Sequence, residues 1–208
     1  MIATDPASGG TVYVAVGAAL YRSTDSGDNW TALGNGNSTA AVTAVSPSHA
    51  PDQIIVGRAD GTIQSVIPSP NSYGTPVWKT IYAEPNKKSV AKIVASADSI
   101  TVAFNVDWGT RLVRLTNVNG TWKPVDITGD LVSGTWVRNM DMDIKNPGTI
   151  YVGTLGGAFV GREVAPTKWV WSKINGIPLV EVTSVALDNV NSKAYFATWG
   201  RGLYEITK

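Results

Sequence analysis

The chain has 208 residues and a net charge of +1, and charged side chains make up 16% of it, below the roughly 25% of an average globular domain. This balance argues against nucleic-acid partners, which need a Lys/Arg stripe, and no apolar run approaches the roughly 18 residues of a membrane span. The absence of cysteine excludes disulfides, thiolate metal sites and cysteine nucleophiles.

The predicted elements are short strands that recur in a fixed order along the chain. The first strand of each group is predicted at 1–5, where it is truncated, and at 42–46, 90–96, 137–143 and 182–188. The second is β-branched and ends in a small residue, at 11–15, 53–57, 99–103, 149–153 and 193–197. The third follows at 20–24, 63–67, 112–116, 158–162 and 203–207.

A fourth strand carries a tryptophan at a regular interval. Trp30, Trp78, Trp122 and Trp171 are separated by 48, 44 and 49 residues. A period of roughly 40–50 residues with several short strands is typical of a β-propeller, one blade per repeat. The sequence therefore predicts an all-β β-propeller of four-stranded antiparallel blades in a single domain, 1–208. Four blades are full, and a fifth is partial: 1–39, 40–85, 86–130, 131–178 and 179–208.

The two ends of the repeat leave the closure of the propeller open. The last blade lacks a predicted fourth strand, and the first has only part of its first strand. The chain closes as five blades with a three-stranded seam, or it is a piece, C-terminal in position, of a propeller of roughly six to eight blades. We favour the second arrangement because an open edge strand promotes aggregation.

One turn carries a recognisable motif. Residues 23–30, Ser-Thr-Asp-Ser-Gly-Asp-Asn-Trp, match the pattern S-x-D-x-G-x-x-W. They resemble the BNR/Asp-box propellers, a group that spans sialidases, xyloglucanase-type glycoside hydrolases, sortilin-like receptors and photosystem-assembly factors. The segment 197–205 is similar to the G-R-G-aromatic ending of such proteins. The resemblance implies a structural turn formed by Ser23, Asp25, Gly27 and Trp30, with Trp30 packed between blades.

Short polar side chains of the first strands have two interpretations. A shared repeat position at the strand end indicates turn caps, at Asp5, Ser46, Ser96, Asp143 and Asp188. Asp141 is different, because its equivalents are small and apolar in a strand that lines the central channel. Such an exception is a candidate functional residue. The alternative is a carboxylate that accepts a neighbouring indole or backbone N–H.

The connections between strands two and three and between blades are expected to gather on one face, where propellers generally bind ligands. The tryptophans and arginines outside the repeat fall there and are the candidate ligand-binding residues: Trp108, Trp136, Trp199, Arg58, Arg138 and Arg201. Aromatic faces beside charged groups suit a sugar, and they equally suit a protein, for which Trp and Arg are the usual anchors. Loops that fold over to plug the channel are the structural alternative.

These observations predict a binding or interaction module for a glycan or a protein, without a cofactor or a metal site. The alternative is the C-terminal part of a xyloglucanase- or sialidase-like glycoside hydrolase, with Asp141, Asp60 or Asp107 in a carboxyl pair roughly 5–10 Å apart. The Arg-Ile-Pro motif of sialidases is absent, which favours binding over catalysis. The resemblance implies an extracellular or periplasmic location, although the chain shows no signal peptide.

Overall fold

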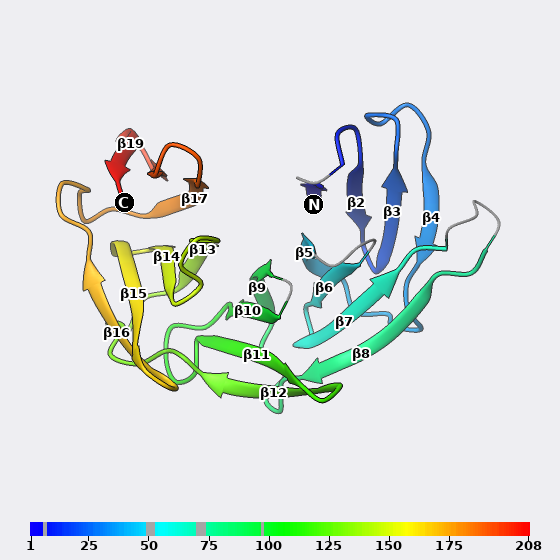
Figure 1. The fold of residues 1–208 in the computed structure, drawn as a ribbon, viewed down its shortest axis with the longest axis horizontal. Helices are drawn as coiled ribbons and strands as arrows, with labels where there is room; N and C mark the ends of the chain where they lie inside the picture. Colours follow the sequence, from blue (N-terminus) through cyan, green and yellow to red (C-terminus); the bar gives the residue numbers. More distant parts are fainter. Residues whose placement is uncertain (6–7, 49–52, 70–73, 97) are drawn as a thin grey trace. The chain divides into compact units, whose positions relative to one another are not determined.

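The computed structural model describes residues 1–5, 8–48, 53–69, 74–96 and 98–208. These described residues form nineteen strands joined by turns, and none of them is helical. The strands are arranged in five antiparallel sheets, four of four strands and one of three (Figure 1). The prediction of a β-propeller with four full blades and a partial fifth is confirmed.

Each sheet is a meander in which strands that follow one another along the chain are hydrogen-bonded neighbours. The first sheet contains β1 (Ile2–Thr4), β2 (Val12–Val16), β3 (Ala19–Ser23) and β4 (Thr31–Gly34). The second contains β5 (Val42–Pro47), β6 (Ile54–Arg58), β7 (Thr62–Ile67) and β8 (Val77–Ala83). The third contains β9 (Val90–Ala95), β10 (Ser99–Phe104), β11 (Leu112–Val118) and β12 (Thr121–Asp126).

The last two sheets differ in their number of strands. The fourth contains β13 (Val137–Met142), β14 (Thr149–Thr154), β15 (Gly157–Ala165) and β16 (Lys168–Lys173). The fifth contains only β17 (Val182–Asp188), β18 (Lys193–Thr198) and β19 (Gly202–Thr207). It ends after its third strand, as the repeat predicted.

The described chain divides into two compact units. The first unit is residues 1–100 with 117–122, and it contains sheets β1–β4 and β5–β8 and strand β9. The second unit is residues 101–116 with 123–208, and it contains sheets β13–β16 and β17–β19. Each unit is described by itself below, and the single domain over residues 1–208 stays a prediction.

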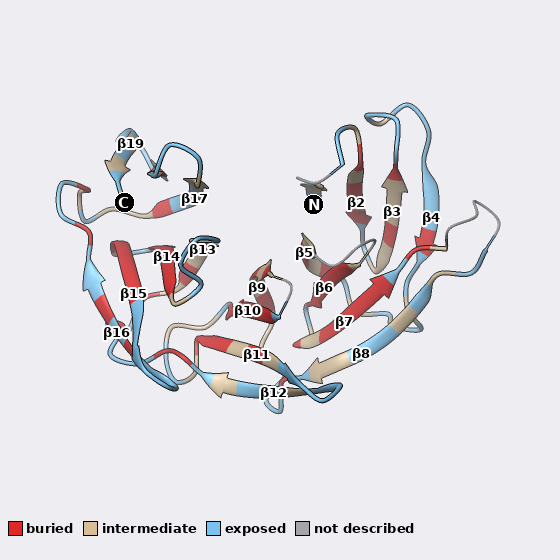
Figure 2. Cartoon of the chain, viewed as in Figure 1, coloured by how far each residue is buried: buried red, intermediate tan, exposed pale blue. Residues whose placement is uncertain are grey.

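The core of the first unit lies between its two complete sheets. Tyr13 and Leu20 from the first sheet pack against Ile54, Val56 and Val66 from the second, and all five are at most 2% exposed. Every residue of β6 is buried, because both faces of its sheet are covered (Figure 2). This explains why the second strand of the repeat is an apolar run without the alternation of a half-exposed strand.

Small residues end the second strands because the next sheet approaches closely there. A Cβ atom on Gly57 would lie 2.5 Å from Val90 Cγ1, and one on Gly153 would lie 2.7 Å from Val182 Cγ1. In the second unit Val182 also belongs to the core cluster that joins sheets β13–β16 and β17–β19, together with Tyr151 and Phe196. Each valine therefore fills the space that its glycine leaves open.

Candidate functional site

The loops of the second unit form one connected surface, which we call the loop surface. It consists of residues 105–110, 131–136, 155–156, 178–181 and 199–201, between and beyond the strands. Backbone hydrogen bonds join neighbouring loops: Gly134 N donates to Asp107 O (2.9 Å), Leu155 N to Trp136 O (3.2 Å), and Trp199 N to Glu181 O (2.8 Å). These bonds join 105–110, 131–136 and 155–156 into one group and 178–181 and 199–201 into another, and the side-chain hydrogen bond from Arg138 to Glu181 links the two groups.

Large apolar side chains stand exposed on this loop surface. Trp108 is 71% exposed, Trp199 is 74% exposed and Leu179 is 68% exposed. Val132 and Leu155 add exposed apolar area at 58% and 36%. Exposed tryptophans on loops are candidate anchors for a partner.

Trp136 and Arg138 occupy the same surface in a more ordered setting. The Arg138 guanidinium carbon lies 5.0 Å from the centroid of the Trp136 ring, within the range of a cation–π contact. Arg138 Nε also donates to Glu181 Oε1 at 2.8 Å, and both side chains are about one-third exposed. The structure therefore brings Trp136 and Arg138 together, and Arg201 lies exposed in the turn after Trp199.

Arg58 lies in the first unit and differs from the other predicted arginines. Its side chain has no exposed surface, and its guanidinium donates to Asn35 O (2.6 Å), Ala40 O (2.7 Å) and Ala18 O (3.2 Å). Arg58 Nε donates to Gln64 Oε1 at 2.7 Å. Burial lowers the pKa of the guanidinium. In this position Arg58 fastens loops, and a predicted contact with a ligand finds no surface on it.

The sequence interpretation missed Arg111, which has the same function in the second unit. Arg111 is 2% exposed and donates to Thr135 O at 3.2 Å and to the carbonyls of Leu131 and Val132. It thereby fixes the loop that carries Val132 and Trp136. The only sign of Arg111 in the sequence is its position directly before the apolar residues Leu112 and Val113, which begin a strand.

Two of the three predicted carboxylates, Asp141 and Asp60, accept hydrogen bonds from nearby backbone N–H groups. Asp141 Oδ1 accepts from Met142 N (2.8 Å) and Oδ2 from Leu187 N (2.9 Å), so Asp141 ties β13 to β17. Asp60 Oδ1 accepts from Thr62 N at 3.0 Å in the turn before β7. Asp60 belongs to the first unit, and Asp107 and Asp141 belong to the second. Their catalytic role stays a prediction.

The Asp-box segment forms the turn between β3 and β4. Asp25 Oδ1 accepts from Ser23 Oγ (2.7 Å) and Asn29 N (2.9 Å), and Gly27 has a φ of 104°. The hydrogen bonds from Asn29 and Ser23 lower the pKa of Asp25 to about 2. Trp30 departs from the expectation of packing between blades, because it is 43% exposed. Membership of the Asp-box group stays a prediction.

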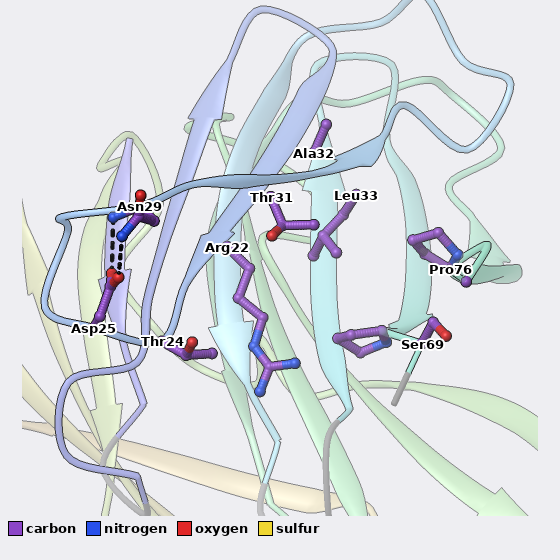
Figure 3. A pocket seen from close by; sticks show the side chains of 11 residues that line it. Arg22, Thr24, Asp25, Asn29, Thr31, Ala32, Leu33, Ser69 and Pro76 are labelled. Carbon is purple, nitrogen blue, oxygen red and sulfur yellow. Dashed lines mark hydrogen bonds between the residues drawn. The ribbon is translucent and has the colours of Figure 1, made fainter. Parts of the chain in front are cut away.

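A hollow of about 410 Å³ lies beside this turn. Figure 3 shows the Arg22 side chain extending between Thr24 and Ser69, and the bond pair from Asn29 to Asp25 at the rim. None of the predicted ligand-binding residues lines it. The hollow is therefore separate from the group of tryptophans and arginines predicted from the loops.

Known proteins resemble this chain in structure alone. No family model matches the sequence, and no curated protein is significantly similar to it. The computationally designed Ika4 protein aligns with a TM-score of 0.56 and 11% identity over 82% of this chain and 93% of Ika4. The β-propeller domain of Cps50 (Swd1) from Myceliophteria thermophila aligns with a TM-score of 0.68 and 7% identity over 98% of this chain and 64% of that domain.

A third structure, YCF48 bound to a D1 peptide, aligns with a TM-score of 0.62 and 12% identity over 96% of this chain and 61% of YCF48. At these identities the likenesses show the β-propeller fold and no more. The chain spans less than two-thirds of the second and third structures. Among the described residues, no helix is long and apolar enough to cross a membrane.

Proposed function

We propose that the chain is an interaction module that binds a peptide segment of a protein partner on the loop surface. The observation that carries this proposal is the exposure of Trp108, Leu179 and Trp199 on loops that backbone hydrogen bonds hold in place. Tryptophan is the most frequent anchor of protein interfaces, and an anchor presented by a rigid loop loses little conformational entropy when it is buried.

The surroundings of the two exposed indoles suit the polar backbone of a bound peptide. Glu181 and Arg201 belong to the loop surface, and Arg138 in β13 pairs with Glu181 at its edge, so the edge offers charged donors and an acceptor. An apolar centre with a polar rim is the usual composition of a specific protein interface. The YCF48 structure holds a D1 peptide, which supports a peptide as an occupant of this fold.

A glycan is the second candidate, because an exposed indole face also stacks against a sugar ring. Trp108 and Trp199 are exposed enough for such stacking. The hydrolase alternative ranks behind both binding functions, because Asp141 already accepts two backbone N–H groups from β13 and β17.

A selection experiment tests this proposal. The immobilised chain is panned against a phage-displayed library of random peptides, and it is applied in parallel to a glycan array. Dissociation constants are then measured for the wild type, Trp108→Ala, Trp199→Ala and the control Trp30→Ala, which alters an exposed tryptophan of the first unit. We expect each loop substitution to weaken a selected peptide roughly 10- to 100-fold and the control to leave it unchanged.

The outcomes separate the candidates. Glycan binding that depends on Trp108 or Trp199, without any peptide binding, would favour the second candidate and overturn the first. Peptide binding that is indifferent to both substitutions would remove the loop surface as the site.

A further inference from the structure

The first sheet has one covered face and one open face. Tyr13, Ala15 and Leu20 point into the core shared with β5–β8, so the alternate residues of β2 and β3 lie on the opposite side. We call this side the open face and define it by Ile2, Thr4, Val12, Val14, Val16, Tyr21 and Trp30. Ile2 is 71% exposed, Val16 is 64% exposed and Trp30 is 43% exposed.

The same repeat positions are buried in the second sheet. Val12, Val14 and Val16 of β2 correspond in the repeat to Ile54, Val56 and Arg58 of β6. The three residues of β6 have no exposed surface. Gln64 of β7, the equivalent of Tyr21, is 5% exposed. In the second sheet these positions face the first sheet, which covers them. The open face thus has the residue positions that form a blade interface in the second sheet.

Two of the periodic tryptophans, Trp78 and Trp171, show what a neighbouring sheet supplies. Trp78 Nε1 donates to Leu33 O at 2.8 Å, and Leu33 lies in β4, the outer strand of the preceding sheet. Trp171 Nε1 donates to Ile127 O at 3.1 Å, and Ile127 directly follows β12, again the outer strand of the preceding sheet. Each indole therefore fastens its own sheet to a backbone carbonyl of the sheet before it.

Trp30 occupies the equivalent position in the first sheet. Trp78 pairs with Val66, the fifth residue of β7, and Trp171 pairs with Gly161, the fifth residue of β15. Thr31 pairs with Arg22, which places the preceding Trp30 beside Ser23, the fifth residue of β3. Trp30 therefore has the same register position as the other two, and it is 43% exposed.

We propose that the open face docks a further four-stranded antiparallel sheet of the propeller type, whose outer strand offers a backbone carbonyl to Trp30 Nε1. The seven side chains of the face carry no charge, so covering them desolvates no ion. Trp78 and Trp171 fit this occupant, because each donates to a backbone carbonyl at the outer strand of a sheet of this type.

The test extends the full chain and follows Trp30. A copy of residues 131–181, which contains β13–β16 and the connection that leads into the next first strand, is fused before Met1. A second extension with a copy of residues 40–85 guards against misfolding of the first. Both are labelled with 5-fluorotryptophan, and Trp30→Phe identifies the Trp30 line in the ¹⁹F NMR spectrum.

We expect the Trp30 line to lose its H₂O/D₂O isotope shift in the extended chains, whereas the line of Trp199, an exposed tryptophan of the other unit, keeps it. Trp30→Phe should lower the urea midpoint only in the extended chains. Trp78→Phe should lower it with and without the extension, because its acceptor Leu33 O is already present.

Two results would overturn the proposal. Trp30 could remain exposed in both extended chains, with no change in the effect of Trp30→Phe. Alternatively, the unextended chain could double its mass in light scattering with concentration-dependent burial of Trp30, which would make a second copy of the chain the occupant.

Discussion

Replacing Arg58 with methionine removes the cation that holds together the loops of the first unit. The guanidinium of Arg58 donates to three backbone carbonyls, those of Ala18, Asn35 and Ala40, and to the amide oxygen of Gln64. Methionine fills a similar volume without any donor, so all four acceptors lose their partner in a site where Arg58 itself has no exposed surface.

The magnitude follows from these contacts. A hydrogen bond to a charged group contributes about 1.5–3 kcal/mol, and a buried acceptor without a donor costs about 1–3 kcal/mol. Because the four contacts share one guanidinium, they do not add, and breaking such a buried set costs about 3–5 kcal/mol. This is a large part of the 5–15 kcal/mol by which a domain is usually stable.

Urea unfolding followed by circular dichroism measures the loss. At a slope of about 2 kcal/mol per molar urea, a loss of 4 kcal/mol lowers the midpoint by about 2 M. Arg58→Lys keeps the charge without the planar fork and should fall between the wild type and Arg58→Met. Arg201→Met, at an exposed position, should stay within about 0.5 kcal/mol of the wild type. A loss below about 1 kcal/mol for Arg58→Met would refute the structural role assigned to it.

Three further predictions address other contacts. Asp25→Asn should remove the contribution of Asp25 to the acid dependence of stability between about pH 4 and pH 2. Because the pKa of Asp25 is lowered to about 2, its ionised form stabilises the fold fully above the unfolded pKa of about 3.9, and this stabilisation is lost as the pH falls through about 2. Urea midpoints measured against pH test this, and parallel profiles of the variant and the wild type would contradict it. Gly153→Ala should lower the free energy of unfolding by about 1–3 kcal/mol, because the added Cβ would lie 2.7 Å from the Val182 carbonyl oxygen. The control Gly9→Ala, whose Cβ would have no atom within 4 Å, should leave the urea midpoint unchanged. Asp141→Asn should destabilise the chain by about 1–2 kcal/mol through the lost acceptor of Leu187 N, and unchanged stability would reopen a role for Asp141 in function.

The repeat made the fold predictable, because each sheet repeats the same local requirements. The small residue that ends strand two is needed where a valine of the next sheet approaches, as Val182 approaches Gly153. The periodic tryptophan of the second and fourth sheets is needed where an indole N–H meets a carbonyl of the preceding sheet, as at Trp78 and Leu33. Such requirements leave a sequence pattern at each blade.

The candidate site was predictable only in part. Trp108 and Trp199 fall outside the repeat, so the sequence marked them as loop residues, and the structure leaves both exposed. Arg58 was predicted in a loop and lies at the end of β6, and its position gave no sign that carbonyls from three distant residues converge on it, because carbonyls belong to every residue and leave no pattern. Arg111 was missed for the same reason.

Trp30 shows a second limit of sequence reasoning. Its position in the repeat predicted a scaffold residue packed between blades, whereas Trp30 is 43% exposed. A repeat position describes the neighbour that a side chain is suited to, and the exposure of Trp30 depends on whether that neighbour is present.

The central claim, that the loop surface of the second unit binds a peptide partner, is tested most directly by locating a bound ligand. The chain is labelled with 5-fluorotryptophan and titrated with a peptide selected from the library, while the ¹⁹F line of each tryptophan is followed. We predict that the Trp108 and Trp199 lines shift with saturation and lose their solvent isotope effect, while the line of Trp30 in the first unit stays in place. Saturable binding that leaves the Trp108 and Trp199 lines unmoved would contradict the claim.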